Sequence, residues 1–175
     1  MGTTITCFGH ITEEGTSLVE WRLMLPSCEL WRGMEEFYRE LGDDVITRFC
    51  EGVLGERARR EYAESGDPLK RFHFPAFRYT LEGKICYETA SLISIRLDAA
   101  LRRKGEHAPR SVGVEAHTWE VESGMLLPPK QVLEAVGEEA MSRKERRMTK
   151  SVLLTAEGIF LCDGTKLFPR ENKKI

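Results

Sequence analysis

Among the residues able to do acid–base chemistry, His117 is the one with a titratable neighbour on the same side of a strand. Glu115 lies two positions before it, so both side chains point to one face if this stretch is extended. A carboxylate beside an imidazole is a conceivable catalytic pair. Neighbours of this kind on one strand are usually exposed surface, and no further group at local spacing completes a site. We therefore assign no catalytic residue.

The other reactive residue types are spread too widely to predict a metal or cofactor site. None of the four histidines has a second histidine or cysteine two to four positions later. The five cysteines are odd in number and contain no CxxC pair, which favours free thiols over one or two disulfides. GxSxG, HExxH, P-loop and GxGxxG patterns are absent. These histidines and cysteines are His10, His73, His107, His117, Cys7, Cys28, Cys50, Cys86 and Cys162.

Composition describes an ordinary globular chain. Its 175 residues, 41% hydrophobic and 31% charged, predict a single α+β domain over 1–175. A net charge of −2 gives no reason to expect nucleic acid or an anionic membrane as partner. The longest apolar runs fall far short of the ~20 residues that span a bilayer. Without a signal-like N-terminus the sequence as written predicts a cytoplasmic protein, and an extracytoplasmic one if it is truncated.

Two alternating stretches predict the sheet that carries His117. Apolar residues recur at every second position over 93–101 and again over 112–118, which is typical of half-buried strands. The alternation changes phase at Trp119, and this predicts a β-bulge at 117–119. Further strands are expected over 3–11, 17–25 and 85–101, with a hairpin turn at 82–84, and a final hairpin over 151–162.

Helical spacing of apolar residues predicts two helices, over 28–62 and 129–147. Glycines in the first helix suggest a kink near Gly42. The expected fold is thus α+β: an antiparallel β-sheet built on 84–121, covered on one face by two α-helices.

Trp119 has two possible roles. Turned inward, it would pack against Val132, Leu133 and Val136 of the following helix, and this is the favoured interpretation. Turned outward, it would be an exposed aromatic residue and a candidate partner contact, together with His117 and His107.

The order of several short motifs resembles a bacterial domain of unknown function. These motifs are Ser94-Ile95-Arg96 on a long strand, the segment 119–127, a helix with Val132, and Leu154-Thr155-Ala156-Glu157-Gly158-Ile159. The domain is found in the extracytoplasmic part of RsiV-type, lysozyme-responsive anti-sigma factors and beside some peptidoglycan deacetylases. The resemblance covers roughly 70–168 and implies an α+β fold and a binding role, without a catalytic residue.

Two departures limit what the resemblance implies. Gly105-Glu106-His107 only faintly matches the family's Gly-Gly-His-type loop, and Pro128-Pro129 replaces its usual aspartate. Lysozyme binding is therefore assigned to no residue. The sequence predicts a non-enzymatic binding or regulatory domain with a protein or cell-wall glycan partner. The alternative is a hydrolase whose site is assembled only by the tertiary structure, and the oligomeric state is left open.

Overall fold

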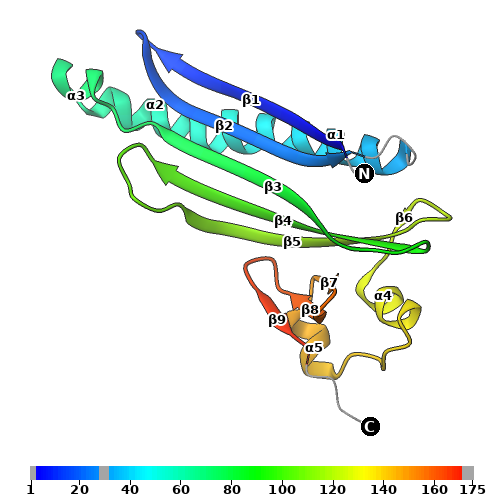
Figure 1. The fold of residues 1–175 in the computed structure, drawn as a ribbon. Helices are drawn as coiled ribbons and strands as arrows, with labels where there is room; N and C mark the ends of the chain where they lie inside the picture. The colour runs from blue at the N-terminus through cyan, green and yellow to red at the C-terminus, as the bar shows by residue number, and fades with distance from the viewer. Residues whose placement is uncertain (1–2, 28–31, 171–175) are drawn as a thin grey trace.

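The computed structural model describes residues 3–27 and 32–170 and has an α+β architecture. A large curled sheet of six strands dominates it (Figure 1). The strands follow one another across the sheet in sequence order. They are β1 (Thr3–Glu13), β2 (Thr16–Ser27), β3 (Phe77–Glu88), β4 (Leu92–Arg103), β5 (Arg110–Glu120) and β6 (Met125–Leu126).

The sheet is mixed, whereas an antiparallel sheet was expected. All neighbouring strands run antiparallel except β2 and β3, which are parallel from Val19 opposite Phe77 to Met24 opposite Glu82. A parallel pair needs a long crossover to bring the chain back to the same end of the sheet. The helices between residues 32 and 72 provide that crossover, so the helical insertion explains why this pair is parallel.

The crossover contains one long helix along a face of the sheet. It comprises α1 (Arg32–Asp44), the π-helical segment η1 (Val45–Leu54) and α2 (Gly55–Glu64), and a short α3 (Pro68–Phe72) follows. The helix predicted over 28–62 is therefore present, although residues 28–31 lie outside the described part. Its buried side chains pack into the main core with those of β2, β3 and β4.

The buried positions of this helix recur every fourth residue. An α-helix advances 100° per residue, so a four-residue repeat drifts by about 40° each time and would leave the sheet. The wider turns of η1 counteract this drift and keep one face inward. The buried positions that follow this repeat are Met34, Tyr38, Gly42, Cys50, Leu54, Ala58 and Tyr62.

Glycines mark close approaches in this core and do not break the helix. A Cβ added at Gly55 would lie 2.8 Å from Ile11 Cδ1, and one at Gly42 would lie 3.1 Å from Leu25 Cδ1. The helix continues through Gly42 and changes to π-helical turns at Val45, and the kink near Gly42 stays a prediction.

Gly83 also marks a close approach, and the prediction of a hairpin turn at 82–84 is wrong. Gly83 lies inside β3, where an added Cβ would meet Pro26 Cδ at 2.5 Å. The chain turns later, where Thr89 Oγ1 accepts from the amide of Leu92 at 3.0 Å. The central strand β4 consequently begins at Leu92 and not at residue 85.

The bulge predicted at 117–119 is also misplaced. The pairing of β4 with β5 is unbroken from Leu92 opposite Glu120 to Ala99 opposite Gly113, and the register shifts only beyond Ala99. The apolar pattern changes phase near Trp119 because both faces of β5 are covered there. Thr118 and Trp119 are both buried, although they point in opposite directions.

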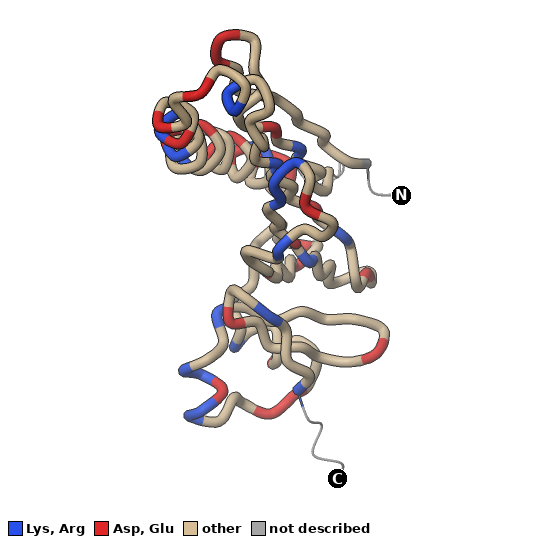
Figure 2. Tube along the Cα trace, turned by 90° about the vertical axis from the view of Figure 1, so that its left-hand side faces the viewer, with Lys and Arg blue, Asp and Glu red and all other residues tan. Residues whose placement is uncertain are grey.

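Residues 129–170 form a separate layer under the sheet (Figure 1). It contains α4 (Pro129–Ala135), α5 (Arg143–Met148) and a three-stranded antiparallel sheet of β7 (Ser151–Thr155), β8 (Gly158–Cys162) and β9 (Leu167–Pro169). The final hairpin is therefore where it was predicted. Lys and Arg as well as Asp and Glu occur in the long helix, in the large sheet and in the C-terminal layer (Figure 2).

The second predicted helix, over 129–147, is not one helix and does not cover the large sheet's helical face. Gly137, with φ +74°, follows α4, and Ser142 starts α5 with a capping box to Glu145. Val132 and Leu133 of α4 pack with the small sheet and Leu92. A cover of two helices on one face is thus not confirmed.

Candidate functional site

His117 and Trp119 lie on the helical face of β5, opposite Ile95 and Ile93 of β4. Trp119 is 6% exposed, so the inward orientation is confirmed. Its neighbours are Phe37 and Tyr38 of α1, at ring-centroid distances of 5.2 and 6.1 Å. The expected packing against Val132, Leu133 and Val136 is wrong, because α4 lies in the other layer.

A chain of hydrogen bonds runs from this core to the surface. Trp119 Nε1 donates to Tyr38 Oη at 3.3 Å, and Tyr38 Oη lies 3.1 Å from His117 Nδ1. An indole nitrogen can only donate, so Tyr38 is free to direct its own proton to Nδ1. This arrangement assigns the imidazole proton to Nε2, which lies 3.5 Å from Glu115 Oε2.

Electrostatics differ between the two ends of this hydrogen-bonded chain. Burial raises the pKa of the Tyr38 phenol far above its ordinary value, so it remains protonated. The hydrogen bond from His117, aided by the charge of Lys150, lowers the pKa of Glu115, against a smaller opposing effect of desolvation. The Glu115 side chain is 61% exposed, so an ionised carboxylate is presented to solvent.

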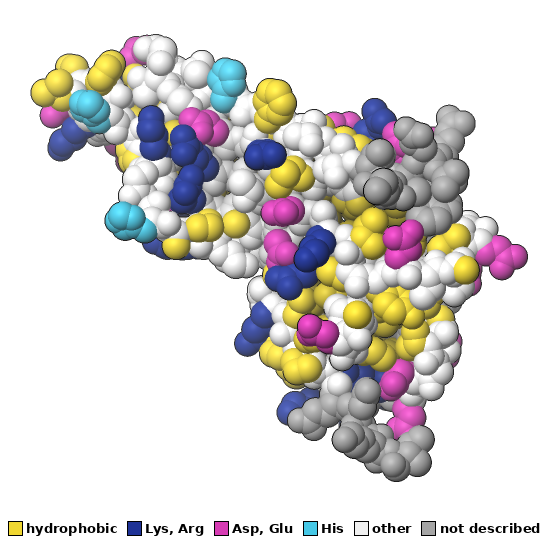
Figure 3. All heavy atoms as spheres, in the orientation of Figure 1, with side chains coloured by type: hydrophobic (Ala, Val, Ile, Leu, Met, Phe, Trp, Pro, Cys, Tyr) yellow, Lys and Arg dark blue, Asp and Glu magenta, His cyan; other side chains and the backbone are white. Residues whose placement is uncertain are grey.

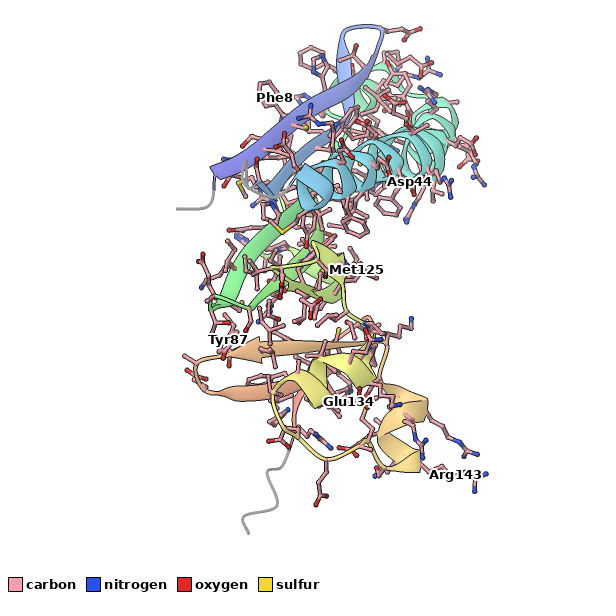
Figure 4. All side chains as sticks on the ribbon, turned by 90° about the vertical axis from the view of Figure 1, so that its right-hand side faces the viewer. Phe8, Asp44, Tyr87, Met125, Glu134 and Arg143 are labelled. Atoms are coloured by element: carbon pink, nitrogen blue, oxygen red, sulfur yellow. The ribbon has the colours of Figure 1, made fainter. Side chains whose placement is uncertain are left out.

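Next to Glu115 lies a hollow of about 450 Å³ between β5, β6 and the start of β7. Figure 4 shows the labelled Met125, which precedes the lining residue Leu126, on the side of the large sheet that faces the C-terminal layer. Apolar and polar side chains both contribute to its lining. The lining residues are Glu115, Ala116, His117, Leu126, Leu127, Pro128, Pro129, Lys150, Ser151 and Gly164.

The outer edge of β5 lies beside the hollow. Its backbone groups form single hydrogen bonds with several separate segments. The amide of Leu127 donates to Thr118 O at 2.8 Å, and the amide of Val114 donates to Gly164 O at 3.2 Å. Between them the amide of Ala116 donates to Ser151 Oγ at 3.2 Å. Within 3–27 and 32–170, the Ala116 carbonyl has no partner from outside the strands. Ala116 is 2% exposed, so this edge of β5 is covered by its neighbours.

The three candidate contact residues do not come together. His107 is exposed in the turn before β5, at the far end of that strand from His117 and Trp119. Two important neighbours were missed. Tyr38 is 79 residues from His117 and looks like a core position of a helix, and Lys150 sits in a charged run. No local spacing could have linked either residue to β5.

Other chemistry-bearing groups belong to the structure. Among the described residues, no group of three or more His, Cys, Asp or Glu side chains is placed to hold a metal ion, and no helix is long and apolar enough to cross a bilayer. Cys7, Cys50, Cys86 and Cys162 are free, and burial raises the pKa of the Cys50 thiol to about 12. Cys28 lies outside the described residues.

A second, larger hollow of about 680 Å³ surrounds Arg170. The Arg170 side chain is 9% exposed. Its guanidinium contacts Glu145 at 3.2 Å and Glu138 at 3.4 Å, while Nη2 donates to Glu139 O at 2.8 Å. These bonds connect the end of β9 to α5 and to the loop that precedes α5. We assign this arginine a structural role.

Comparison with known proteins gives fold neighbours and no function. No protein-family model matches this sequence, and no curated protein does either. A DUF3298 family structure from Pseudomonas aeruginosa is similar over 92% of this chain and 80% of its own, with 12% identity and a TM-score of 0.49. A second, from Bacteroides fragilis, covers 92% and 81%, with 8% identity and a TM-score of 0.45. Neither description mentions an anti-sigma factor or a deacetylase, and similarities of this size transfer no activity.

Proposed function

We propose that this chain is a non-enzymatic binding domain with a regulatory role, and that it takes an extended segment of a protein partner into the hollow beside β5. The observation that carries this proposal is the hollow of about 450 Å³ beside β5, whose lining includes the exposed side chain of Leu126. An extended segment can place one of its side chains in such a hollow, since pockets for alternate side chains give specificity in the recognition of extended peptides.

The walls of the hollow support the same choice. Leu126, Leu127, Pro128 and Pro129 offer an apolar side, and Figure 3 shows hydrophobic side chains gathered where β6, α4 and the small sheet meet. Met125, beside this wall, is 62% exposed. Glu115 and Lys150 contribute charged groups to the same lining. A peptide that combines an apolar side chain with a polar or charged one matches this mixed lining.

The hydrogen-bonded chain of His117 supports binding over hydrolysis. A nucleophile must be exposed and adjacent to its base. Tyr38, which contacts His117, is 0% exposed and is engaged on both sides. Ser151 lines the hollow, but its hydroxyl oxygen accepts from the Ala116 amide. Among the hydrogen bonds of the described residues, none joins Ser151 to His117. The hydrogen-bonded chain of His117 therefore contains no accessible nucleophile, and it positions the Glu115 side chain.

The experiment is a selection of displayed random peptides on the purified chain, followed by calorimetry. We expect the selection to yield extended peptides that contain an apolar residue. These peptides should bind the Leu126→Glu variant at least about tenfold more weakly than the wild type, a loss of about 1.4 kcal/mol in binding free energy. Met148→Glu is the matched control, because Met148 is similarly exposed (45% against 37%) and lies on α5, away from this hollow. It should leave affinity unchanged.

Three outcomes would contradict the proposal. Peptides that bind both variants equally would place binding elsewhere. Oligosaccharides from a cell-wall glycan array that bind in a Leu126-dependent way, with no peptide selected, would replace the protein partner by a glycan. Turnover of a hydrolase substrate that disappears in His117→Asn and Glu115→Gln would restore the hydrolase alternative.

A further inference from the structure

The first strand of the large sheet leaves a long edge unpaired. β1 pairs with β2 on one side only and is the terminal strand of the sheet (Figure 1). Between Thr4 and Thr12, no group outside the β1–β2 ladder forms a hydrogen bond with its backbone in the part of the chain that the structure describes. We propose that β1 pairs antiparallel with β1 of a second copy of this chain, joining two sheets across a twofold axis.

The other sheet edges in the described residues are shorter or more nearly closed. The outer edge of β5 pairs with β6 at Trp119 and Glu120, and its Ala116 and Val114 amides bond to Ser151 and Gly164. β6 has two residues, and β9 has three and includes Pro169. The outer edge of β7 is bonded by hydroxyl groups of the large sheet: Thr118 Oγ1 donates to Val152 O, and Ser94 Oγ accepts from the Leu154 amide. β1 differs from all of these, because it is eleven residues long and its outer edge is unpaired in the described residues.

β1 also lacks the features that normally prevent edge pairing. Monomeric sheets protect their edges with lysines, prolines, inward charges or bulges. From Thr3 to Thr12 there is no proline and no Lys, Arg, Asp or Glu, and the register shifts only at Ile11 and Thr12. Gly9, which would weaken the strand, is covered by the ring of Trp21, since an added Cβ would lie 2.5 Å from Trp21 Cζ2. The edge is therefore regular and uncharged.

The side chains of β1 complement themselves when the axis passes through Phe8. Its solvent-facing ring is 82% exposed, the highest value among the large apolar residues described, and Figure 4 shows it at the rim of the sheet. Phe8 would face its own copy, and Thr6 would face His10. Cross-strand aromatic pairs stabilise such a ladder, and no like charges oppose one another.

The helical face gains from the same register. Ile5 and Ile11 are half-buried at the margin of the main core, and they would lie opposite each other across the new pair. Their outer sides would leave water as the second sheet continues the first. A twofold arrangement closes the edge for both copies and leaves no further edge to grow from β1.

The test is sedimentation of the full chain over a range of concentrations. We expect a monomer–dimer equilibrium, with Phe8→Lys dissociating the dimer at least about tenfold more readily because two lysines would meet at the axis. Phe72→Lys is the matched control, since Phe72 is 75% exposed on α3 and should leave the equilibrium unchanged. A wild-type chain that remains monomeric at high concentration, or a dimer indifferent to Phe8→Lys, would overturn the proposal.

Cysteine cross-linking tests the register independently of stability. In a background with serine at Cys7, Cys28 and Cys86, Phe8→Cys should form a disulfide-linked dimer on mild oxidation, because directly opposed residues meet the distance a disulfide needs. Thr4→Cys should not cross-link to itself, since Thr4 would face Thr12 of the other copy. Equal cross-linking by both variants would rule out an axis at Phe8.

Discussion

The two faces of β4 and β5 are both buried, but what covers them differs in kind. One face lies under α1, and the other lies under the edge of β7. A helix satisfies its backbone groups internally, whereas a strand edge arrives with unpaired N–H and C=O groups. The helical face accordingly uses aromatic packing, while the other face supplies two hydroxyls, Ser94 and Thr118, which lie 2.8 Å apart.

This difference suggests how a sheet can carry a layer on each side. Ser94 and Thr118 are 0% and 2% exposed and would be costly without partners. Here they substitute for the missing neighbouring strand of β7. Cys162 Sγ adds a weaker bond to Val114 O at 3.1 Å. Removal of an aromatic ring should therefore have the largest effect on stability on the helical face. On the face covered by β7, removal of a single hydroxyl group should already lower stability.

The largest effect is expected on the helical face. Trp119→Ala should lower the free energy of unfolding by about 3–5 kcal/mol, because it removes a buried ring that contacts Phe37 and Tyr38. Urea denaturation followed by circular dichroism measures this change. An unshifted midpoint would show that the ring does not contribute to the core.

The second effect concerns the other face. Thr118→Val keeps the shape of the side chain but leaves Val152 O without its donor, so we expect a loss of about 1–3 kcal/mol. Thr80→Val is the control, because Thr80 is exposed on β3 and should change stability by less than about 0.5 kcal/mol. Equal values for the two variants would remove the distinction between the faces.

A smaller effect should follow from Tyr38→Phe. The ring remains, but Trp119 Nε1 loses its acceptor and His117 Nδ1 loses its donor. About 1 kcal/mol is expected, since the indole bond is long. Nitrogen NMR of His117 should also show a less strongly preferred tautomer. A tautomer signal identical to that of the wild type would contradict the proposed direction of these bonds.

The smallest effect depends on pH. The pKa of Glu115 is lower in the folded state, so its stabilising contribution is present above the ordinary value of 4.5 and is lost as pH falls through the folded pKa. Glu115→Gln should thus be less stable at neutral pH by at most about 1 kcal/mol, given the exposure of the pair. Unfolding midpoints of both proteins should converge in acid, and a constant gap would refute this assignment.

Local periodicity predicted much of this fold from the sequence. Alternation over 93–101 and 112–118 identified β4 and β5, and helical spacing located the long helix. It failed where a residue serves a distant neighbour. Gly83 looks like a turn residue, yet it is a strand glycine that makes room for Pro26. The phase change at Trp119 looks like a bulge, yet it reflects burial of both faces.

The candidate site was less accessible to prediction. His117 and Glu115 were noted because they are close in sequence, but Tyr38 and Lys150 join them only through the tertiary structure. The bonds that cover the outer edge of β5, from the Ala116 amide to Ser151 and from the Val114 amide to Gly164, also depend on what surrounds the strand. Backbone groups leave no trace in residue identity, so no pattern of side chains could have indicated these bonds.

The π-helical segment makes the number of residues in the long helix part of its fit to the sheet. Deleting one exposed residue of η1, such as Thr47, would shift every later position by about 100° around the axis. Leu54, Ala58 and Tyr62 would then turn away from the core, although none of them had been changed. Among related chains, insertions and deletions should therefore be rarer between residues 45 and 54 than in the loops, even at exposed positions.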